Sequence, residues 1–391
     1  MKSLRTLFFL SGISFVAFLF SCCSHKPTRH LIDEQAAVSE DEMKVLKSGK
    51  KYYYPIKMKP KLLPEIKEKS YWERLKELNT NTARTHPLNF LPADPVQVEK
   101  AFPPNDSTGF FITWLGHSSL LIQMDGFKIL FDPVLANEVS PAPFFRSVRR
   151  FQENAPVTAA EIPPVDLIFI SHDHYDHLDK KAILELAPKT NRFVTSVGVG
   201  ERLIDWGVPA EKVQILSWWE ESVFENSAGK KLNYAGTPGR HFSGRSLLDR
   251  NTTLWISWVV WTKEHKIFHS GDTSYGPHFK QIGFHYGPFD YSFMECGQYN
   301  RRWSNNHQFP EETVQAHLDI RGEILFPIHW GAFSLAPHTW WDPPARVKIA
   351  AEKAGVKLIT PRVGQTINAD NPEPTDSWWE PLVEAENLSA Q

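Results

Sequence analysis

Residues 165–179 read Val-Asp-Leu-Ile-Phe-Ile-Ser-His-Asp-His-Tyr-Asp-His-Leu-Asp. The first part of this stretch is a short, mainly apolar run rich in branched side chains, which predicts a buried strand. Three imidazoles then follow between His172 and His177, together with the carboxylate of Asp176. A loop that leaves a core strand is held rigidly at one end and open to solvent at the other, as a reactive metal centre requires.

The side chains of this loop indicate the kind of metal. Imidazole and carboxylate groups suit zinc or a similar divalent cation, and catalytic sites keep one position open for water. The alternative is a polar turn that happens to be rich in histidine. Four potential ligands in His-x-His-x-Asp-His spacing directly after an apolar strand favour the metal site. These are His172, His174, Asp176 and His177.

This spacing resembles the metallo-β-lactamase superfamily, in which the motif supplies ligands to two adjacent metals. The resemblance implies an α+β fold, an αββα sandwich of two mixed β-sheets flanked by helices, with the site at one sheet edge. It also implies that further ligands follow downstream in the order His, Asp, His.

Three downstream residues meet that order, each after a predicted strand. His241 follows 231–235, Asp272 follows 266–269, and His329 follows 324–328. Each of them, taken alone, is compatible with a hydrogen-bonded loop residue. By the resemblance, one metal is bound by His172, His174 and His241, the other by Asp176, His177 and His329, and Asp272 bridges the two.

Two further residues are candidates for supporting the ligands. Asp132 lies before Pro133 at the end of another predicted strand, and outer carboxylates of this kind orient ligand imidazoles. An Asp that initiates a turn before Pro is the alternative. His117 is either a group behind the ligands or a simple turn residue.

Several segments narrow the resemblance to N-acyl-phosphatidylethanolamine-hydrolysing phospholipase D. They are residues 112–119, 218–221, 255–258, 271–275, 287–290, 307–312 and 328–331. That family uses two zinc ions to release an N-acylethanolamine and phosphatidic acid. A histidine at the position of His307 contacts the substrate phosphate there, and Asn306 stands where the family has Gln. The alternative for His307 is a structural residue before the predicted helix 311–320.

The resemblance implies a chemistry in which Asp176, Asp272 and His307 take part. Two metals roughly 3.5–4 Å apart lower the pKa of bound water, so that hydroxide on the metals attacks phosphorus. A donor such as His307 offsets charge on a phosphate oxygen or protonates the leaving oxygen. Zinc is the expected cofactor, as two ions, and another divalent metal remains an alternative.

Composition limits the partners. The formal net charge of the 391 residues is −2, so no overall basic field attracts nucleic acid. Aromatic residues make up 13%, which suits a large core and apolar substrate surfaces. Cys296 follows an apolar run and is predicted to be buried, while Cys22 and Cys23 lie beside a leader, so no disulfide framework is expected.

The N-terminus predicts export. Lys2 and Arg5 precede an uncharged stretch, 7–20, that is too short for an ordinary membrane-spanning helix. With Leu19 three residues before Cys22, the stretch resembles a bacterial lipoprotein signal, which implies cleavage before Cys22 and lipidation of its thiol. A plain secretory signal or an uncleaved anchor is the alternative. We expect a lipid-anchored protein on the periplasmic or cell-surface side of a membrane.

The chain divides into a series of expected regions. A helix at 71–78 is amphipathic and either contacts lipid headgroups or docks on the domain. The C-terminal end is expected to be irregular apart from Trp378 and Trp379. The regions are a signal (1–21), a tether (22–49), an N-terminal extension (50–108), a hydrolase domain (109–369) and a tail (370–391).

Periodicity predicts the elements of the hydrolase domain. The expected strands are 110–115, 119–124, 128–131, 165–170, 192–197, 212–216, 231–235, 253–262, 266–269, 291–296, 324–328 and 356–360. The expected helices are 180–186, 200–206, 311–320 and 344–354.

The sequence thus predicts a di-zinc phosphodiesterase of phospholipase D type that acts on N-acyl-phosphatidylethanolamine or a related glycerophospholipid. One alternative is a lactonase or ester hydrolase on the same framework, like ascorbate-6-phosphate lactonase. Another is a non-catalytic surface lipoprotein in which metals are structural. The latter is disfavoured because structural zinc sites are often rich in thiolates, and no candidate ligand is Cys.

Overall fold

The computed structural model describes residues 31–32, 39, 41–58, 85–103, 108–140 and 148–388. The predicted leader with Cys22 and the predicted helix 71–78 lie outside these residues. The expected limits of the regions remain predictions.

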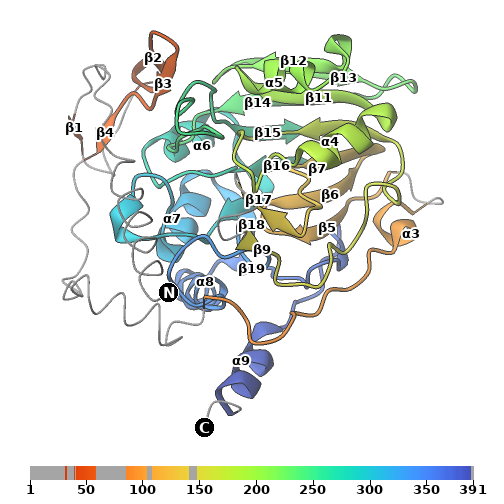
Figure 1. The fold of residues 1–391 in the computed structure, drawn as a ribbon, viewed down its shortest axis with the longest axis vertical. Coiled ribbons are helices and arrows are strands. Elements are labelled where there is room, and N and C mark those ends of the chain that lie inside the picture. The colour runs from red at the N-terminus through yellow and green to blue at the C-terminus, as the bar shows by residue number, and fades with distance from the viewer. Residues whose placement is uncertain are drawn as a thin grey trace, which may run out of the picture.

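Two sheets form the centre of the molecule, each with seven strands (Figure 1). In sheet order, the first contains β12 (Val213–Leu216), β11 (Thr190–Ser196), β10 (Val165–Phe169), β7 (Phe127–Phe131), β6 (Ser119–Met124), β5 (Phe111–Gly116) and β20 (Thr366–Asn368). The second contains β13 (Glu221–Glu225), β14 (Lys231–Thr237), β15 (Ser257–Trp261), β16 (Lys266–His269), β17 (Phe289–Glu295), β18 (Gly322–Ile328) and β19 (Lys357–Leu358). Both sheets mix parallel and antiparallel pairs.

The first sheet is buried on both faces because successive side chains of a strand point to opposite sides. Phe131 and Phe169 face the core between the sheets, where Phe169 lies 5.4 Å, between ring centroids, from Trp258 of the second sheet. Leu130 and Ile168, one residue away along the same strands, join the core on the outer side. This double burial explains why these strands read as continuous apolar runs.

Helices cover the outer faces. The first sheet carries α3 (Val98–Ala101), α4 (Lys180–Leu186) and α5 (Val199–Asp205). The second carries α6 (His278–His285), α7 (Pro310–Asp319) and α8 (Asp342–Ala354). The expected αββα sandwich of α+β class is therefore confirmed.

The observed elements differ from the expected ones where contacts between distant parts of the chain determine the ends of an element. β15 begins at Ser257 and not at 253, because the backbone of the preceding residues bonds elsewhere, with Ile256 N donating to Ser171 O. The prediction of an irregular C-terminal end was wrong, because α9 (Trp379–Leu388) forms there (Figure 1). Trp379 is buried against Trp330, at 5.5 Å between ring centroids.

Short elements lie outside the sandwich. Part of the expected tether, residues 41–49, carries η2 (Asp41–Met43) and β2 (Leu46–Ser48), and Met43 is buried. The two-stranded pairs are β1 (Leu31–Ile32) with β4 (Lys57–Met58), β2 with β3 (Lys51–Tyr53), and β8 (Glu138–Val139) with β9 (Val148–Arg149). In the described part of the chain, no helix has the length and apolar character needed to cross a membrane.

A charged clamp joins the two sheets at one end. Nδ1 of His265, before β16, lies 3.0 Å from the carboxylate of Asp125 in the turn between β6 and β7. Its Nε2 lies 3.2 Å from Asp370. The hydrogen bond to Asp125 raises the pKa of His265, and Asp370 adds to the effect.

This clamp predicts a pH-dependent stability. Since the pKa of His265 is higher in the folded protein than its ordinary value of 6.5, the stabilisation is present below that value and is lost as pH rises through the folded pKa. The pair is partly exposed, so we expect His265→Gln to lower the free energy of unfolding by up to about 1 kcal/mol at pH 5.5 and by much less at pH 9. Denaturant unfolding at both pH values checks this, and an equal loss at the two values would contradict it.

Candidate metal centre

The candidate ligands converge because the strands that carry them end at one edge. β7 is parallel to β10, and β16, β17 and β18 are parallel to one another. Parallel strands have their carboxyl ends at the same edge, which is where ligands bind in such sheets. The His-rich loop follows β10, Asp272 follows β16, and His329 follows β18 directly.

One group of ligand atoms is formed by His172, His174, His241 and Asp272, which lie within 4.8 Å of one another. Nε2 of His172 lies 2.8 Å from Nδ1 of His174, and Nε2 of His241 lies 3.2 Å from the same atom. Nδ1 of His241 donates to the carbonyl oxygen of Asn306 at 2.8 Å, which leaves Nε2 to face the group.

A second group is formed by His117, Asp176, His177 and His329. Nε2 of His177 lies 3.4 Å from Oδ2 of Asp176. The same carboxylate oxygen lies 2.8 Å from Nε2 of His117. His117, expected behind the ligands or in a simple turn, is therefore fully buried beside a candidate ligand.

Asp272 lies between the two groups. Its Oδ1 is 3.1 Å from Nε2 of His177 and 3.1 Å from Nδ1 of His329. Its Oδ2 is 3.6 Å from Nε2 of His241 and 3.8 Å from Nε2 of His172. One carboxylate oxygen thus faces each group, which is the arrangement that a shared ligand of two cations requires.

The protonation of the cluster also fits cations. Burial, with nearby charged groups, holds the pKa of His172, His241 and His329 well below the ordinary value, so these imidazoles keep their lone pairs at neutral pH. Burial raises the pKa of Asp272 to about 7. A carboxyl group buried in this way gains from a cation that offsets its charge.

Unsatisfied atoms point to the same conclusion. Nε2 of His177, Nε2 of His329 and Oδ1 of Asp272 are buried and have no hydrogen-bond partner among the described residues. Buried polar atoms are normally paired, and a cluster of exceptions calls for a bound group. The donor set of imidazole nitrogens and carboxylate oxygens fits zinc or a similar divalent cation.

Asp132 organises the start of the His-rich loop. Its carboxylate accepts from Nδ1 of His177 at 2.8 Å, from the backbone N of Ser171 at 2.7 Å and from Ser171 Oγ at 2.6 Å. The contact with His177 fixes which imidazole nitrogen faces the cluster. Asp132 thus lies where an orienting carboxylate was expected, and Ser171 is a partner that the pattern did not single out.

Backbone strain accompanies the site. His117, Asp132 and His329 have φ values of 53°, 39° and 67°, in the left-handed region that residues other than glycine rarely adopt. Two backbone hydrogen bonds between their segments hold two of them, since His117 N donates to Trp330 O and His329 N donates to His117 O, each at 3.0 Å. Such strain persists only where the surroundings enforce it, and it clusters at functional sites.

Further residues hold the loop from outside. Arg245 donates from Nη1 to the carbonyl oxygens of Asp173 and Leu178, and its guanidinium lies 3.7 Å from the ring centre of Tyr175. The buried carboxylate of Asp173 accepts from Gly244 N at 2.7 Å. Nothing local in the sequence marks Arg245 as a support of the loop. Asp173 stands within the motif, but its spacing alone did not indicate a supporting role.

His307 reaches the cluster from the segment before α7. Its ring stacks on His329, with centroids 5.2 Å apart, and lies edge-on to His241 at 4.9 Å. Asn306 contacts His241 through its backbone carbonyl. Nδ1 of His307 lies 2.7 Å from the carboxylate of Glu295, another residue that was missed. A charged residue inside the apolar segment 291–296 was the signal that could have found it.

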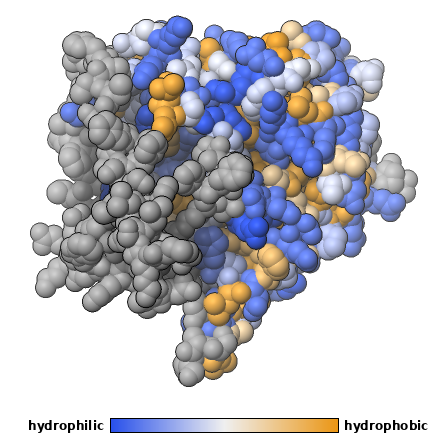
Figure 2. Space-filling view, viewed as in Figure 1, coloured by the Kyte–Doolittle hydropathy of each residue, from blue (hydrophilic) through white to orange (hydrophobic). Residues whose placement is uncertain are grey.

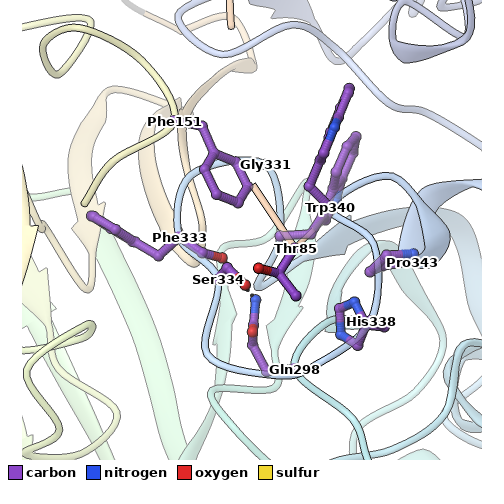
Figure 3. Close-up of a pocket in the computed structure, with 10 residues that line it drawn as sticks. Thr85, Phe151, Gln298, Gly331, Phe333, Ser334, His338, Trp340 and Pro343 are labelled. Carbon is purple, nitrogen blue, oxygen red and sulfur yellow. Dashed lines mark hydrogen bonds between the residues drawn. The ribbon is translucent and has the colours of Figure 1, made fainter. Parts of the chain in front are cut away.

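A small pocket lies beside the His329 segment (Figure 3). It is lined by Thr85, Phe151, Gln298, Trp330, Gly331, Phe333, Ser334, His338, Trp340 and Pro343. Its volume of about 190 Å³ is below the roughly 300–1,000 Å³ of ordinary ligand pockets, and none of the candidate ligands lines it. The pocket therefore does not define where a substrate binds.

The cluster predicts that metal stabilises the fold. We expect a chelator to lower the free energy of unfolding by at least about 2.7 kcal/mol, the stabilisation at a free metal concentration 100 times Kd. Thermal unfolding with and without chelator, alongside elemental analysis, checks this, and added zinc should restore the melting temperature. An unchanged melting temperature after complete loss of metal would contradict it.

Comparison with known proteins agrees with the fold and the site. The family model described as "Beta-lactamase superfamily domain" matches residues 128–330. An uncharacterised protein of Mycobacterium tuberculosis is 39% identical over 278 residues, 70% of this chain and 73% of its own. N-acyl-phosphatidylethanolamine-hydrolyzing phospholipase D 1 of Caenorhabditis elegans is 32% identical over 271 residues, 65% of this chain and 75% of its own.

A solved structure shares the fold. Isothiocyanate hydrolase from Delia radicum gut bacteria superimposes with a TM-score of 0.51 at 19% identity, covering 66% of this chain and 98% of its own. The shared fold, the family match and the His/Asp cluster lead to one assignment: the chain belongs to the beta-lactamase superfamily and is a metal-dependent hydrolase of the metallo-β-lactamase fold.

Proposed function

We propose that the protein is a di-zinc phosphodiesterase of phospholipase D type that acts on N-acyl-phosphatidylethanolamine or a related glycerophospholipid. The observation that carries the di-metal part is the placement of Asp272, with Oδ1 toward His177 and His329 and Oδ2 toward His172 and His241. The substrate class is supported by the name of the Caenorhabditis elegans relative.

In this proposal the residues of the cluster have separate roles. His172, His174 and His241 would hold one zinc ion, Asp176, His177 and His329 the other, and Asp272 would be shared. Two zinc ions, when bound, make water nucleophilic near neutral pH and draw charge from phosphate oxygens. Asp132 orients His177, and His117 braces Asp176 through Nε2. His307 stands beside both groups and can donate a hydrogen bond to a phosphate oxygen.

The surface near the site supports an amphiphilic substrate. The loop that leaves His241 exposes Leu247 at 63% and Leu248 at 90%. Arg250, at the far end of that loop, lies 4.1 Å from the ring centre of Phe242, which packs on His174. Over the visible face as a whole, apolar residues are interspersed among hydrophilic ones (Figure 2). Exposed leucines with a neighbouring cation suit contact with anionic lipid.

Hydrolysis of a lactone or carboxylic ester at the same cluster is the alternative. It uses the same ligands and differs in the first atom attacked. Comparison of turnover on phosphodiesters and on lactones distinguishes the two, because a phosphodiesterase should favour the former by orders of magnitude. A non-catalytic lipoprotein, by contrast, predicts no turnover of either class.

The proposal predicts hydrolysis that depends on Asp272. Zinc-loaded wild type should release an N-acylethanolamine and phosphatidic acid from N-acyl-phosphatidylethanolamine in mixed micelles, measured by mass spectrometry. Residues that only orient metal ligands contribute roughly 10- to 100-fold, so loss of the shared ligand in Asp272→Asn should cost more than about 100-fold and lower the zinc content.

His265→Gln provides the control, because His265 precedes β16 while Asp272 follows it, at the opposite end of the strand. This variant should keep the wild-type rate. Wild type that holds zinc but releases no alcohol from any glycerophospholipid would overturn the proposal, and dominant lactone turnover would favour the alternative.

We also propose that the protein is exported and anchored to a membrane through lipidated Cys22, on the periplasmic or cell-surface side. Cys22→Ser should move the protein from the membrane fraction to the soluble fraction, and the mass of the wild-type N-terminal peptide should show the attached acyl chains. An unmodified peptide, or unchanged fractionation of Cys22→Ser, would contradict the anchor.

A further inference from the structure

Glu295 is a charged residue in an unusual place. It is the last residue of β17 and is fully buried, between the apolar side chains that precede it and Cys296. Burial raises the pKa of its carboxyl group well above the ordinary value. Burying a carboxyl group costs free energy unless its oxygens form hydrogen bonds. The hydrogen-bond partners of Glu295 therefore indicate its role.

The two oxygens of this carboxyl group have separate partners. Oε1 accepts from the backbone N of Thr273 at 3.0 Å and from that of Gln308 at 3.1 Å. Thr273 follows Asp272, and Gln308 follows His307, so Oε1 ties together the two segments that carry these residues. Oε2 lies 2.7 Å from Nδ1 of His307. Oε1 alone accepts the hydrogen bonds that join the two segments, so Oε2 is available to bond the imidazole of His307.

His307 is held on three sides. Glu295 contacts its Nδ1 edge, His329 stacks on its face with an angle of 11° between the rings, and His241 meets it at 69°. The side chain is nevertheless 12% exposed. With Nδ1 engaged, Nε2 at the opposite edge of the ring is the nitrogen left for a ligand.

We propose that Glu295 is a positioning residue, which fixes the His307 ring so that Nε2 donates a hydrogen bond to a phosphate oxygen of the substrate. This inference rests on the proposed function. A phosphate oxygen only accepts, so Nε2 must carry a hydrogen. The hydrogen bond between Oε2 and Nδ1 needs one further hydrogen. Either atom can carry this hydrogen, and Nε2 keeps its own hydrogen in both cases. Without Oε2, the ring can rotate and present carbon in place of Nε2.

The alternative is that Glu295 only ties the two segments together. The two roles differ in how Glu295 depends on His307. A positioning residue has nothing to position once the imidazole is gone, whereas a purely structural residue costs activity whether or not His307 is present. A double-mutant cycle measures this difference directly.

The experiment compares wild type, Glu295→Met, His307→Ala and the double variant, all loaded with zinc. Loss of a single transition-state donor costs roughly 100- to 1,000-fold in kcat, which we expect for His307→Ala. Loss of an orienting group costs roughly 10- to 100-fold, which we expect for Glu295→Met with a smaller change in KM. The double variant should lose much less kcat than the product of the two single losses. Glu295→Gln, which restores both hydrogen-bonding positions, should recover most of the activity.

Two measurements besides activity accompany the cycle. Zinc content should be equal in all four proteins. The affinity for inorganic phosphate, measured by calorimetry, should fall in Glu295→Met but should be the same in the double variant as in His307→Ala. Thr313→Val is the matched control, because it removes a hydrogen bond of 2.7 Å to the backbone carbonyl of Glu295 and leaves the carboxyl group in place. It should keep the kcat and phosphate affinity of wild type.

The outcomes separate the two proposals. Multiplicative losses in the double variant, or zinc loss in Glu295→Met that accounts for its activity, would overturn the positioning role alone. Wild type that cleaves no phosphodiester would overturn the proposed function, and the phosphate affinities would then still decide whether Glu295 positions His307. Unchanged phosphate affinity in Glu295→Met would overturn the inference in either case.

Discussion

The structure depends on a buried carboxylate that two sets of imidazoles share. Asp272 is 4% exposed, and one of its oxygens faces each set. A buried charge of this kind is costly without cations to offset it. Among the imidazoles around it, His329 is held neutral by burial and has an unsatisfied Nε2, and bound cations would complete the compensation of this charge. The burial that makes the site costly in isolation is also what would strengthen its attraction for a metal ion.

The sandwich supplies the rigidity that such a site needs. Strands buried on both faces bring their carboxyl ends to one edge, and every candidate ligand lies on a segment that leaves such an end or a neighbouring turn. Strained backbone at His117, Asp132 and His329 is tolerated because hydrogen bonds from both sheets hold it. The candidate site therefore lies at an edge where hydrogen bonds anchor the loops that carry the ligands.

Besides the candidate ligands, the site contains two carboxyl groups that form hydrogen bonds with imidazoles. Asp132 orients His177, and Glu295 holds His307, each through a contact shorter than 3 Å, at 2.8 Å and 2.7 Å. The first lies at the end of a strand in one sheet and the second at the end of a strand in the other. The two sheets thus contribute equivalent supports to the cluster.

The sequence by itself indicated the fold class and the order of the candidate ligands through its resemblance to the metallo-β-lactamase superfamily, because the apolar strand and the His-rich loop that carry this resemblance are local patterns. It also placed Asp132 at a strand end. Only the tertiary structure decided that Arg245 and Glu295 support the site and that a helix forms at Trp379–Leu388. Glu295 and His307 are 12 residues apart, and Arg245 and Asp173 are 72 apart, so no local periodicity relates them. Their roles arise from which chain segments the closed sandwich brings into contact, and that is a property of packing.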